Sequence, residues 1–231
     1  MVRKNQTAGG DLAARLAADR ERALPALPDS REILERLDRY VALLLQWQAT
    51  TNLIAPSTIP EIWTRHVADS AQLLPLAPGA RRFVDFGSGG GFPGIVIACA
   101  LADTPGAMVH LVESNHKKAA FLREALRHTG APGKVHAMRI EDFVAGFSEP
   151  VEIVTARALA PLENLLGKAY PLMRRGAQAL FLKGQDVDAE LTAASKHWKF
   201  NAELVQSTTD SGGRIVKIGS LEMRNPSVTD D

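Results

Sequence analysis

Residues 84–100 read VDFGSGGGFPGIVIACA, and this stretch decides the fold. A short apolar run contains Asp85 near its end, a glycine-rich loop follows, and Pro93 opens a second apolar run. Glycine tolerates positive φ and has no Cβ, so a ligand can lie directly against the backbone of such a loop. The next helix offers free N–H groups and a positive dipole end, and proline suits its first position. The stretch therefore predicts a strand, a ligand-binding loop and a helix at one edge of an open α/β sheet.

Outside this stretch, the chain divides into a helical part and an alternating part. Before residue 80 the apolar residues follow helical spacing, with one helix starting after Asp29 and Ser30 and a second around residues 62–74. Strands are then expected at 82–86, 108–112, 134–138, 152–156, 177–182, 202–208 and 214–218, and helices at 93–101, 115–129, 161–175 and 186–199. This alternation indicates a mostly parallel sheet, and the turn at Gly212 and Gly213 adds a hairpin with an antiparallel edge strand.

These patterns predict four regions along the chain. They are a flexible or helical tail over 1–28, a helical N-terminal region over 29–79, an α/β domain over 80–220 and a second tail over 221–231.

Composition narrows the class of protein. The chain has 231 residues, 45% of them hydrophobic, and a formal net charge of +1, so nucleic-acid binding must rest on local patches. Cys99 is the only cysteine, which rules out an internal disulfide, and we expect no metal site. The longest apolar stretch, 94–102, is too short to span a bilayer, and the first 28 residues do not resemble a signal peptide. We therefore expect a cytoplasmic protein with no membrane partner.

Taken alone, the glycine loop leaves two cofactors open. Residues 89–94 match the dinucleotide fingerprint GxGxxG, whereas residues 85–91 give an acid followed by GxGxG, which is similar to the first motif of S-adenosylmethionine methyltransferases. The long helical segment before the loop and the antiparallel strand at the end favour the second. Glu113, at the end of the second expected strand, can accept hydrogen bonds from ribose hydroxyls in either class.

Several motifs outside the loop carry a family resemblance. Between residues 33 and 218 they include Arg65-His66-Val67-Ala68-Asp69-Ser70, Phe92-Pro93-Gly94, Thr155-Ala156-Arg157-Ala158 and Leu182-Lys183-Gly184. With these motifs the chain resembles the glucose-inhibited division protein B family, the guanine-N7 methyltransferases of bacterial small-subunit ribosomal RNA. The resemblance implies a Rossmann-like class I S-adenosylmethionine-dependent methyltransferase fold with a mostly parallel seven-stranded sheet. It also implies methyl transfer from S-adenosylmethionine to N7 of a specific guanine in 16S ribosomal RNA.

The resemblance also implies which residues hold the cofactor. Together with the glycine loop and the acid after the second strand, the expected cofactor-binding residues are Gly87, Gly89, Phe92, Glu113, Ile140, Glu141 and Arg157. Gly87 lets the backbone approach the methionine end, and Ile140 can cover an adenine face. Arg157 ends the fourth expected strand, where it can hold either the methionine carboxylate or the guanine.

The chemistry of guanine N7 limits what the site must contain. N7 has a free lone pair and loses no proton on attack, so we expect an in-line displacement with no general base and no metal, in which Arg157 and Lys183 position the reactants. We expect His66, on an amphipathic helix near Asp69, to make a structural hydrogen bond. Expected RNA contacts are cations near the strand ends and on the following helix: Lys117, Lys118, Arg123, Arg139 and Lys183.

Two other functions stay open from the residues themselves. An NAD-dependent oxidoreductase using the same loop predicts NAD binding and no response to S-adenosylhomocysteine. A non-catalytic RNA-binding assembly factor predicts tight RNA binding and a degenerate cofactor loop. If the protein is a ribosomal RNA methyltransferase, the expected partner is small-subunit ribosomal RNA or the small ribosomal subunit, and we expect a monomer.

Overall fold

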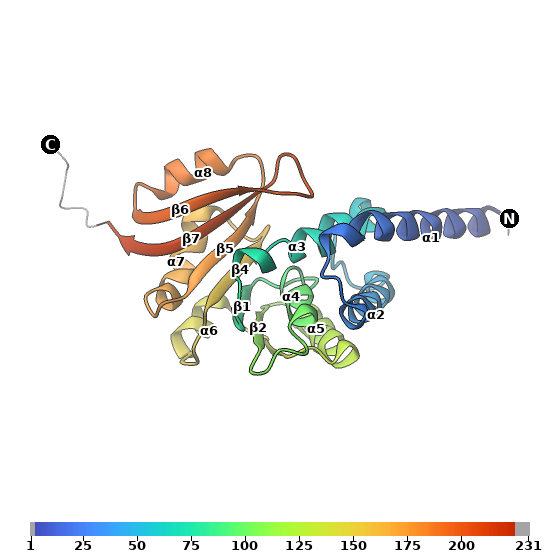
Figure 1. Cartoon of the computed structure of the whole chain (residues 1–231), viewed down its shortest axis with the longest axis horizontal. Coiled ribbons are helices and arrows are strands. Elements are labelled where there is room, and N and C mark those ends of the chain that lie inside the picture. The colour runs from blue at the N-terminus through green and yellow to red at the C-terminus, as the bar shows by residue number, and fades with distance from the viewer. Residues whose placement is uncertain (1–2, 225–231) are drawn as a thin grey trace.

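The computed structural model describes residues 3–224 and contains a twisted seven-stranded sheet with helices packed on both faces (Figure 1). The strands are β1 (Arg82–Phe86), β2 (Met108–Val112), β3 (Gly133–His136), β4 (Ile153–Arg157), β5 (Gln178–Lys183), β6 (Trp198–Gln206) and β7 (Arg214–Met223). They lie in the order β3-β2-β1-β4-β5-β7-β6. β1 to β5 are mutually parallel, and β7 runs antiparallel between β5 and β6. The predicted mostly parallel, seven-stranded sheet is confirmed.

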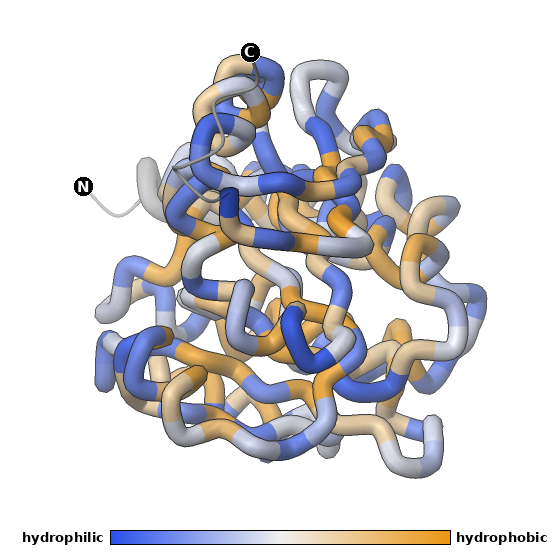
Figure 2. The backbone as a smooth tube through the Cα atoms, turned by 90° about the vertical axis from the view of Figure 1, so that its left-hand side faces the viewer, coloured by the Kyte–Doolittle hydropathy of each residue, from blue (hydrophilic) through white to orange (hydrophobic). Residues whose placement is uncertain are grey.

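The helices belong to two layers separated by the sheet. They are α1 (Arg3–Ala23), α2 (Arg31–Gln48), α3 (Asp69–Ala71), α4 (Gly94–Ala100), α5 (His116–Thr129), α6 (Ile140–Gly146), α7 (Leu162–Met173) and α8 (Val187–Ala194). A π-helical segment, η3 (Trp63–Ala68), runs directly into α3, and a 3-10 helix, η2 (Pro56–Glu61), precedes it. One hydrophobic core joins α2, α4 and α5 to the sheet, and a second joins α6, α7 and α8 to the opposite face. Figure 2 shows hydrophobic segments of the chain running through the interior of the molecule.

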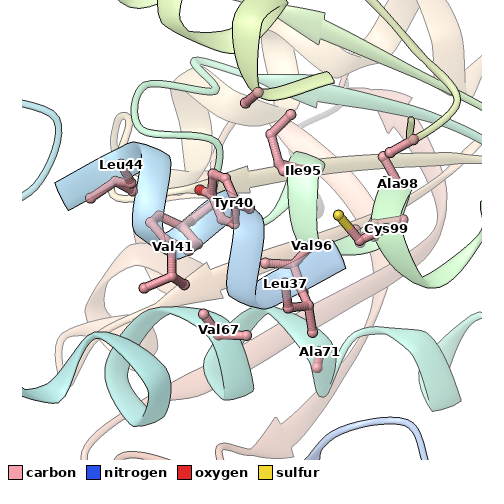
Figure 3. Close-up of a cluster of buried hydrophobic side chains, with 14 of the residues drawn as sticks. Leu37, Tyr40, Val41, Leu44, Val67, Ala71, Ile95, Val96, Ala98 and Cys99 are labelled. Carbon is pink, nitrogen blue, oxygen red and sulfur yellow. The ribbon is translucent and has the colours of Figure 1, made fainter. Parts of the chain in front are cut away.

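The N-terminal helices are part of the first core. Figure 3 shows Leu37 of α2 beside Val96 of α4, with Val67 and Ala71 below α2. Tyr40 and Leu44 are fully buried, and the Tyr40 hydroxyl donates to Gly90 O at 2.5 Å. Burial of aromatic and aliphatic side chains contributes on the order of 2 kcal/mol per residue. The helical region thus supports the glycine loop directly.

α1 contributes one buried acid to this arrangement. Asp19 is 0% exposed, and its carboxylate accepts hydrogen bonds from Trp63 N at 2.8 Å and Thr64 N at 3.2 Å. It also accepts from Thr64 Oγ1 at 2.5 Å and from the Arg22 guanidinium at 2.8 Å. The first N–H groups of a helix have no partner inside the helix, so Asp19 caps η3 from a distant part of the sequence.

The division into four regions stays a prediction. α1 occupies most of the segment expected as an N-terminal tail, and β7 continues to Met223, into the segment expected as a C-terminal tail. Residues 225–231 of that segment lie outside the described residues. Across residues 3–224, none of the helices combines the length and the hydrophobicity that a membrane span requires.

Candidate active site

Two cavities lie at the carboxyl ends of the parallel strands, where open α/β sheets bind ligands. The first has a volume of about 380 Å³, and its lining includes Gly87, Gly89, Glu113, Ile140, Glu141 and Lys168. The second has a volume of about 360 Å³, and its lining includes Arg65, His66, Asp69, Arg157, Lys183, Glu190, Thr209 and Arg214. Ala158, the first residue after β4, lines both cavities. The end of β4 therefore separates two binding spaces.

The wall of the first cavity is built by the glycine loop and Glu113. Gly87 and Gly89 have φ values of +64° and +53°, which favour glycine. Glu113, at the end of β2, accepts from Gly89 N at 2.9 Å and from Asn115 N at 2.7 Å. A Cβ at Gly87 would lie 2.5 Å from Leu159 Cδ1, so a side chain there would have to displace Leu159 from the wall of the cavity. Glu113 thus holds the loop in the shape of a cradle.

The opposite wall of the first cavity comes from the start of α6. Ile140 is the first residue of this helix, and the Glu141 carboxylate pairs with the Lys168 ammonium of α7. The Lys168 hydrogen bond lowers the pKa of Glu141, which stays ionised at neutral pH. An acid at a strand end, an apolar side chain and a glycine cradle fit the ribose, base and methionine parts of S-adenosylmethionine.

Arg157 is the central side chain of the second cavity. Its guanidinium donates to His66 Nδ1 at 2.7 Å and to Arg65 O at 3.1 Å, and its Nη1 lies 3.4 Å from Asp69 Oδ2. The guanidinium also lies over the Phe92 ring, with Cζ 5.1 Å from the centroid. These contacts fix a largely buried cation at the end of β4.

His66 is held as a neutral imidazole. Because arginine can only donate, Nδ1 must carry the lone pair, and Nε2–H therefore donates to Thr58 Oγ1 at 2.8 Å. Burial, together with the Arg157 charge, lowers the pKa of His66 to about 3. The ring stacks on Phe92 with the centroids 4.9 Å apart. Both nitrogens are occupied, which agrees with the structural role expected from the sequence.

Lys183 ends β5 and is tied into the wall of the second cavity. Its ammonium lies 2.6 Å from Glu190 Oε2 and donates to Ala160 O at 2.9 Å, and its side chain is 9% exposed. On the neighbouring strand, Arg214 is the register partner of Lys183. The two cations therefore stand side by side at this edge of the sheet.

The structure distributes the site residues expected from the sequence over several places. The first cavity collects Gly87, Gly89, Glu113, Ile140, Glu141, Lys118 and Arg139, and the second collects Arg157 and Lys183. Phe92 is 4% exposed and lies behind Arg157, packed on His66 and Tyr40. Lys117 and Arg123 lie exposed on α5.

Several residues that line the cavities were not predicted as site residues from the sequence. These are Arg65, Asp69, Lys168, Glu190 and Arg214. Arg214 had a usable signal, because a hairpin closing on β5 places the start of its second strand beside Lys183. Lys168 and Glu190 occupy ordinary helical positions, and no signal in the sequence distinguishes them.

Buried histidines give the protein a pH-dependent stability. Burial lowers the pKa of His66 to about 3 and that of His136 to about 4, and it also lowers the pKa of His110. As pH falls below the ordinary histidine pKa, the unfolded chain therefore binds more protons at these sites than the folded chain does. Acidification therefore favours unfolding. Asp85 acts in the opposite sense, because burial raises its pKa to about 6 and the folded form binds the proton first.

We expect the histidines to outweigh Asp85, so stability falls as pH falls from 6.5 to 4. The net slope of the unfolding free energy is on the order of 1 kcal/mol per pH unit. Urea unfolding followed by circular dichroism at pH 7.5, 6.0 and 5.0 measures it. His136→Asn removes one of the titrating groups and should flatten the slope. A stability that rises on acidification would contradict this assignment.

A family model and two relatives with the same description match most of the chain. A family model described as GidB, rRNA small subunit methyltransferase G, matches residues 33–217. The ribosomal RNA small subunit methyltransferase G of Bradyrhizobium sp. strain BTAi1 is 62% identical over 210 residues, 91% of this chain and 95% of that protein. The protein of the same name from Rhodopseudomonas palustris strain BisB18 is 62% identical over 212 residues, 92% of this chain and 91% of that protein.

Solved structures show the same fold at much lower identity. An O-methyltransferase from Bacillus cereus in complex with S-adenosylhomocysteine gives a TM-score of 0.57 at 15% identity, covering 90% of this chain and all of that one. Cofactor-bound Rv0187 from MTB gives a TM-score of 0.55 at 18% identity, covering 80% of this chain and 89% of that one. At these identities the likeness concerns the fold alone, and it agrees with the class I methyltransferase architecture expected from the sequence.

Proposed function

The chain belongs to the GidB family of small-subunit ribosomal RNA methyltransferases, and on that premise we propose how its two cavities carry out the reaction. The protein transfers the methyl group of S-adenosylmethionine to N7 of a guanine in 16S ribosomal RNA. The first cavity receives the cofactor and the second receives the guanine. The observation that carries this assignment is that Ala158 lines both cavities, so the two cavities adjoin at the end of β4.

In the first cavity the residues act on the cofactor by shape and by hydrogen bonding. When bound, S-adenosylmethionine supplies an electrophilic methyl group on a sulfonium. Glu113 would accept hydrogen bonds from the ribose hydroxyls while keeping the one from the Gly89 amide, and Ile140 would cover one face of the base. Gly87, whose Cβ position is taken by the Leu159 side chain, would present bare backbone to the methionine end.

In the second cavity the residues position the guanine and do not need to remove a proton. N7 attacks with its own lone pair, and His66 has no free nitrogen with which to act as a base. Arg157 presents a fixed positive charge at the end of β4, toward the guanine or the RNA backbone. These residues then raise the rate by aligning N7 with the methyl group and by stabilising charge, as expected for an in-line displacement.

Contacts with the rest of the RNA belong to the cations around the two cavity mouths. We propose Lys117, Lys118, Arg123 and Arg139 for this role, joined by Arg65 and Arg214, which line the second cavity. Lys183, also expected from the sequence, is left out because Glu190 and Ala160 O hold its ammonium. Phosphate contacts of this kind supply salt-dependent affinity without reading the base. We further propose that the protein acts in the cytoplasm on the small ribosomal subunit or its RNA, as a monomer, since residues of one chain line both cavities.

The test is transfer of labelled methyl from S-adenosylmethionine to small ribosomal subunits from cells lacking this gene. We expect one new cleavage site specific for N7-methylguanine. Transfer to no RNA, with a melting temperature still raised by S-adenosylhomocysteine, would contradict the proposed acceptor. A melting temperature raised by NAD and unchanged by S-adenosylhomocysteine would favour an oxidoreductase. Tight RNA binding with no response to either cofactor would favour an assembly factor.

Glu113→Ala is expected to weaken S-adenosylhomocysteine binding by about 10- to 100-fold, because it removes a charged acceptor from both the ribose and the Gly89 amide. Calorimetric titration measures this change. Glu124→Ala is the control, because Glu124 lies on α5 and pairs with Arg127 outside both cavities. Equal affinity in the Glu113 variant and the wild type would exclude Glu113 from the cofactor site.

A further inference from the structure

The wall between the two cavities is a short, strained segment. Ala158 has a φ of +49°, a left-handed value that is unfavourable for a residue with a Cβ and is adopted by no other non-glycine residue between 3 and 224. Such a backbone persists only where surrounding contacts hold it in place. Leu159 follows, and its side chain lies against Gly87 at the edge of the first cavity. The contacts that hold this segment therefore fix the boundary between the two cavities, across which the methyl group would be transferred.

Its C-terminal side is held by a pair of side chains from β5 and α8. Glu190 Oε2 accepts from Leu162 N at 2.6 Å and from the Lys183 ammonium at 2.6 Å. Lys183 in turn donates to Ala160 O at 2.9 Å. The Glu190 carboxylate thus holds the segment at two points. It binds the Leu162 amide directly, and it holds Ala160 O through the Lys183 ammonium. Its N-terminal side is fixed by the contacts of Arg157.

We propose that Glu190 is a positioning residue for methyl transfer, acting through Lys183 and the backbone of residues 160–162. Glu190 faces the second cavity at the side of Lys183, so it also keeps that ammonium turned toward the wall. Without the carboxylate, Lys183 loses its ionic partner and the segment loses one of its two supports. Small errors in the alignment of reacting atoms reduce the rate strongly, whereas cofactor binding depends on other residues. This inference rests on the proposed function.

The experiment compares Glu190→Gln with the wild type in the methyl-transfer assay on small subunits. Glutamine keeps the volume and can still accept from Leu162 N, so the change removes mainly the ion pair. We expect kcat to fall roughly 10- to 100-fold, with the KM for S-adenosylmethionine and the S-adenosylhomocysteine affinity within about twofold. Asp188→Asn, exposed on the same helix and with the same charge change, is the control and should keep both values.

A second comparison tests the route through Lys183. If Glu190 acts through this ammonium, Glu190→Gln should cost little further rate in a Lys183→Met background. Wild-type kinetics in Glu190→Gln, or a parallel loss of cofactor affinity and melting temperature, would overturn the proposal, the latter by showing a merely structural role. Full additivity of the two changes would overturn it as well. A wild-type protein that transfers no methyl would instead contradict the proposed function.

Discussion

Replacing Arg157 with alanine is expected to lower kcat for methyl transfer by about 10²- to 10³-fold, the usual cost of losing one preorganised charge at a reaction centre. The expectation follows from geometry, since Arg157 lines the second cavity and is fixed by His66 and Asp69. S-adenosylhomocysteine should still raise the melting temperature, because Arg157 does not line the first cavity. The assay on small subunits and a thermal shift titration give the two values.

Two variants sharpen this test. Arg157→Lys keeps the charge but cannot reach His66 and Asp69 together, so it should recover only a small part of the rate. Arg31→Ala, exposed on α2 and outside both cavities, removes a cation remote from the wall and should change kcat by less than about threefold. Wild-type kcat in Arg157→Ala would remove Arg157 from the reaction centre. Loss of the thermal shift would instead assign Arg157 to the methionine carboxylate.

Replacing Asp19 with alanine is expected to lower the free energy of unfolding by about 3–5 kcal/mol. The change leaves the amides of Trp63 and Thr64 without their buried acceptor at the start of η3. This helix carries His66, and α3 directly after it carries Asp69, so the loss also loosens one wall of the second cavity. Urea unfolding at constant pH measures the effect.

The matched variants separate the cap from the charge. Asp19→Asn keeps one acceptor oxygen and should cost about 1–3 kcal/mol. Asp11→Asn removes the same charge from an exposed position of α1 and should change stability by less than about 0.5 kcal/mol. If Asp19→Ala unfolded at the same urea concentration as Asp11→Asn, the capping role of α1 would be wrong.

Elements with strong local signals could be predicted closely from the sequence. The expected strands 82–86 and 108–112 coincide with β1 and β2, since buried parallel strands are short continuous apolar runs between turn residues. The final helix was predicted too long, because β6 begins at Trp198 and alternates exposed and half-buried residues as an edge strand does. α6 was missed because it has only seven residues, too few to show a helical period.

Site residues divide in the same way. Glu113 and Arg157 could be predicted because they end strands at the sheet edge where ligands bind. Asp19 and Glu190 could not, because their partners lie 44 and 28 residues away and neither position departs from an ordinary helical pattern. Contacts of this kind are set by how helices pack, which no local spacing records.

The hairpin between β6 and β7 contacts a segment that lies much earlier in the sequence. Thr209 donates to Asp69 across 140 residues of sequence, and Arg214 completes the second cavity, whereas the lining of the first ends at Lys168. A chain leaves the ribosome N-terminus first. During synthesis, the segments that line the first cavity, proposed for the cofactor, are therefore complete while the second cavity, proposed for the guanine, still lacks one wall. The second cavity is completed only after the segment that carries Arg214 has been made, so a shorter nascent chain cannot present both cavities together.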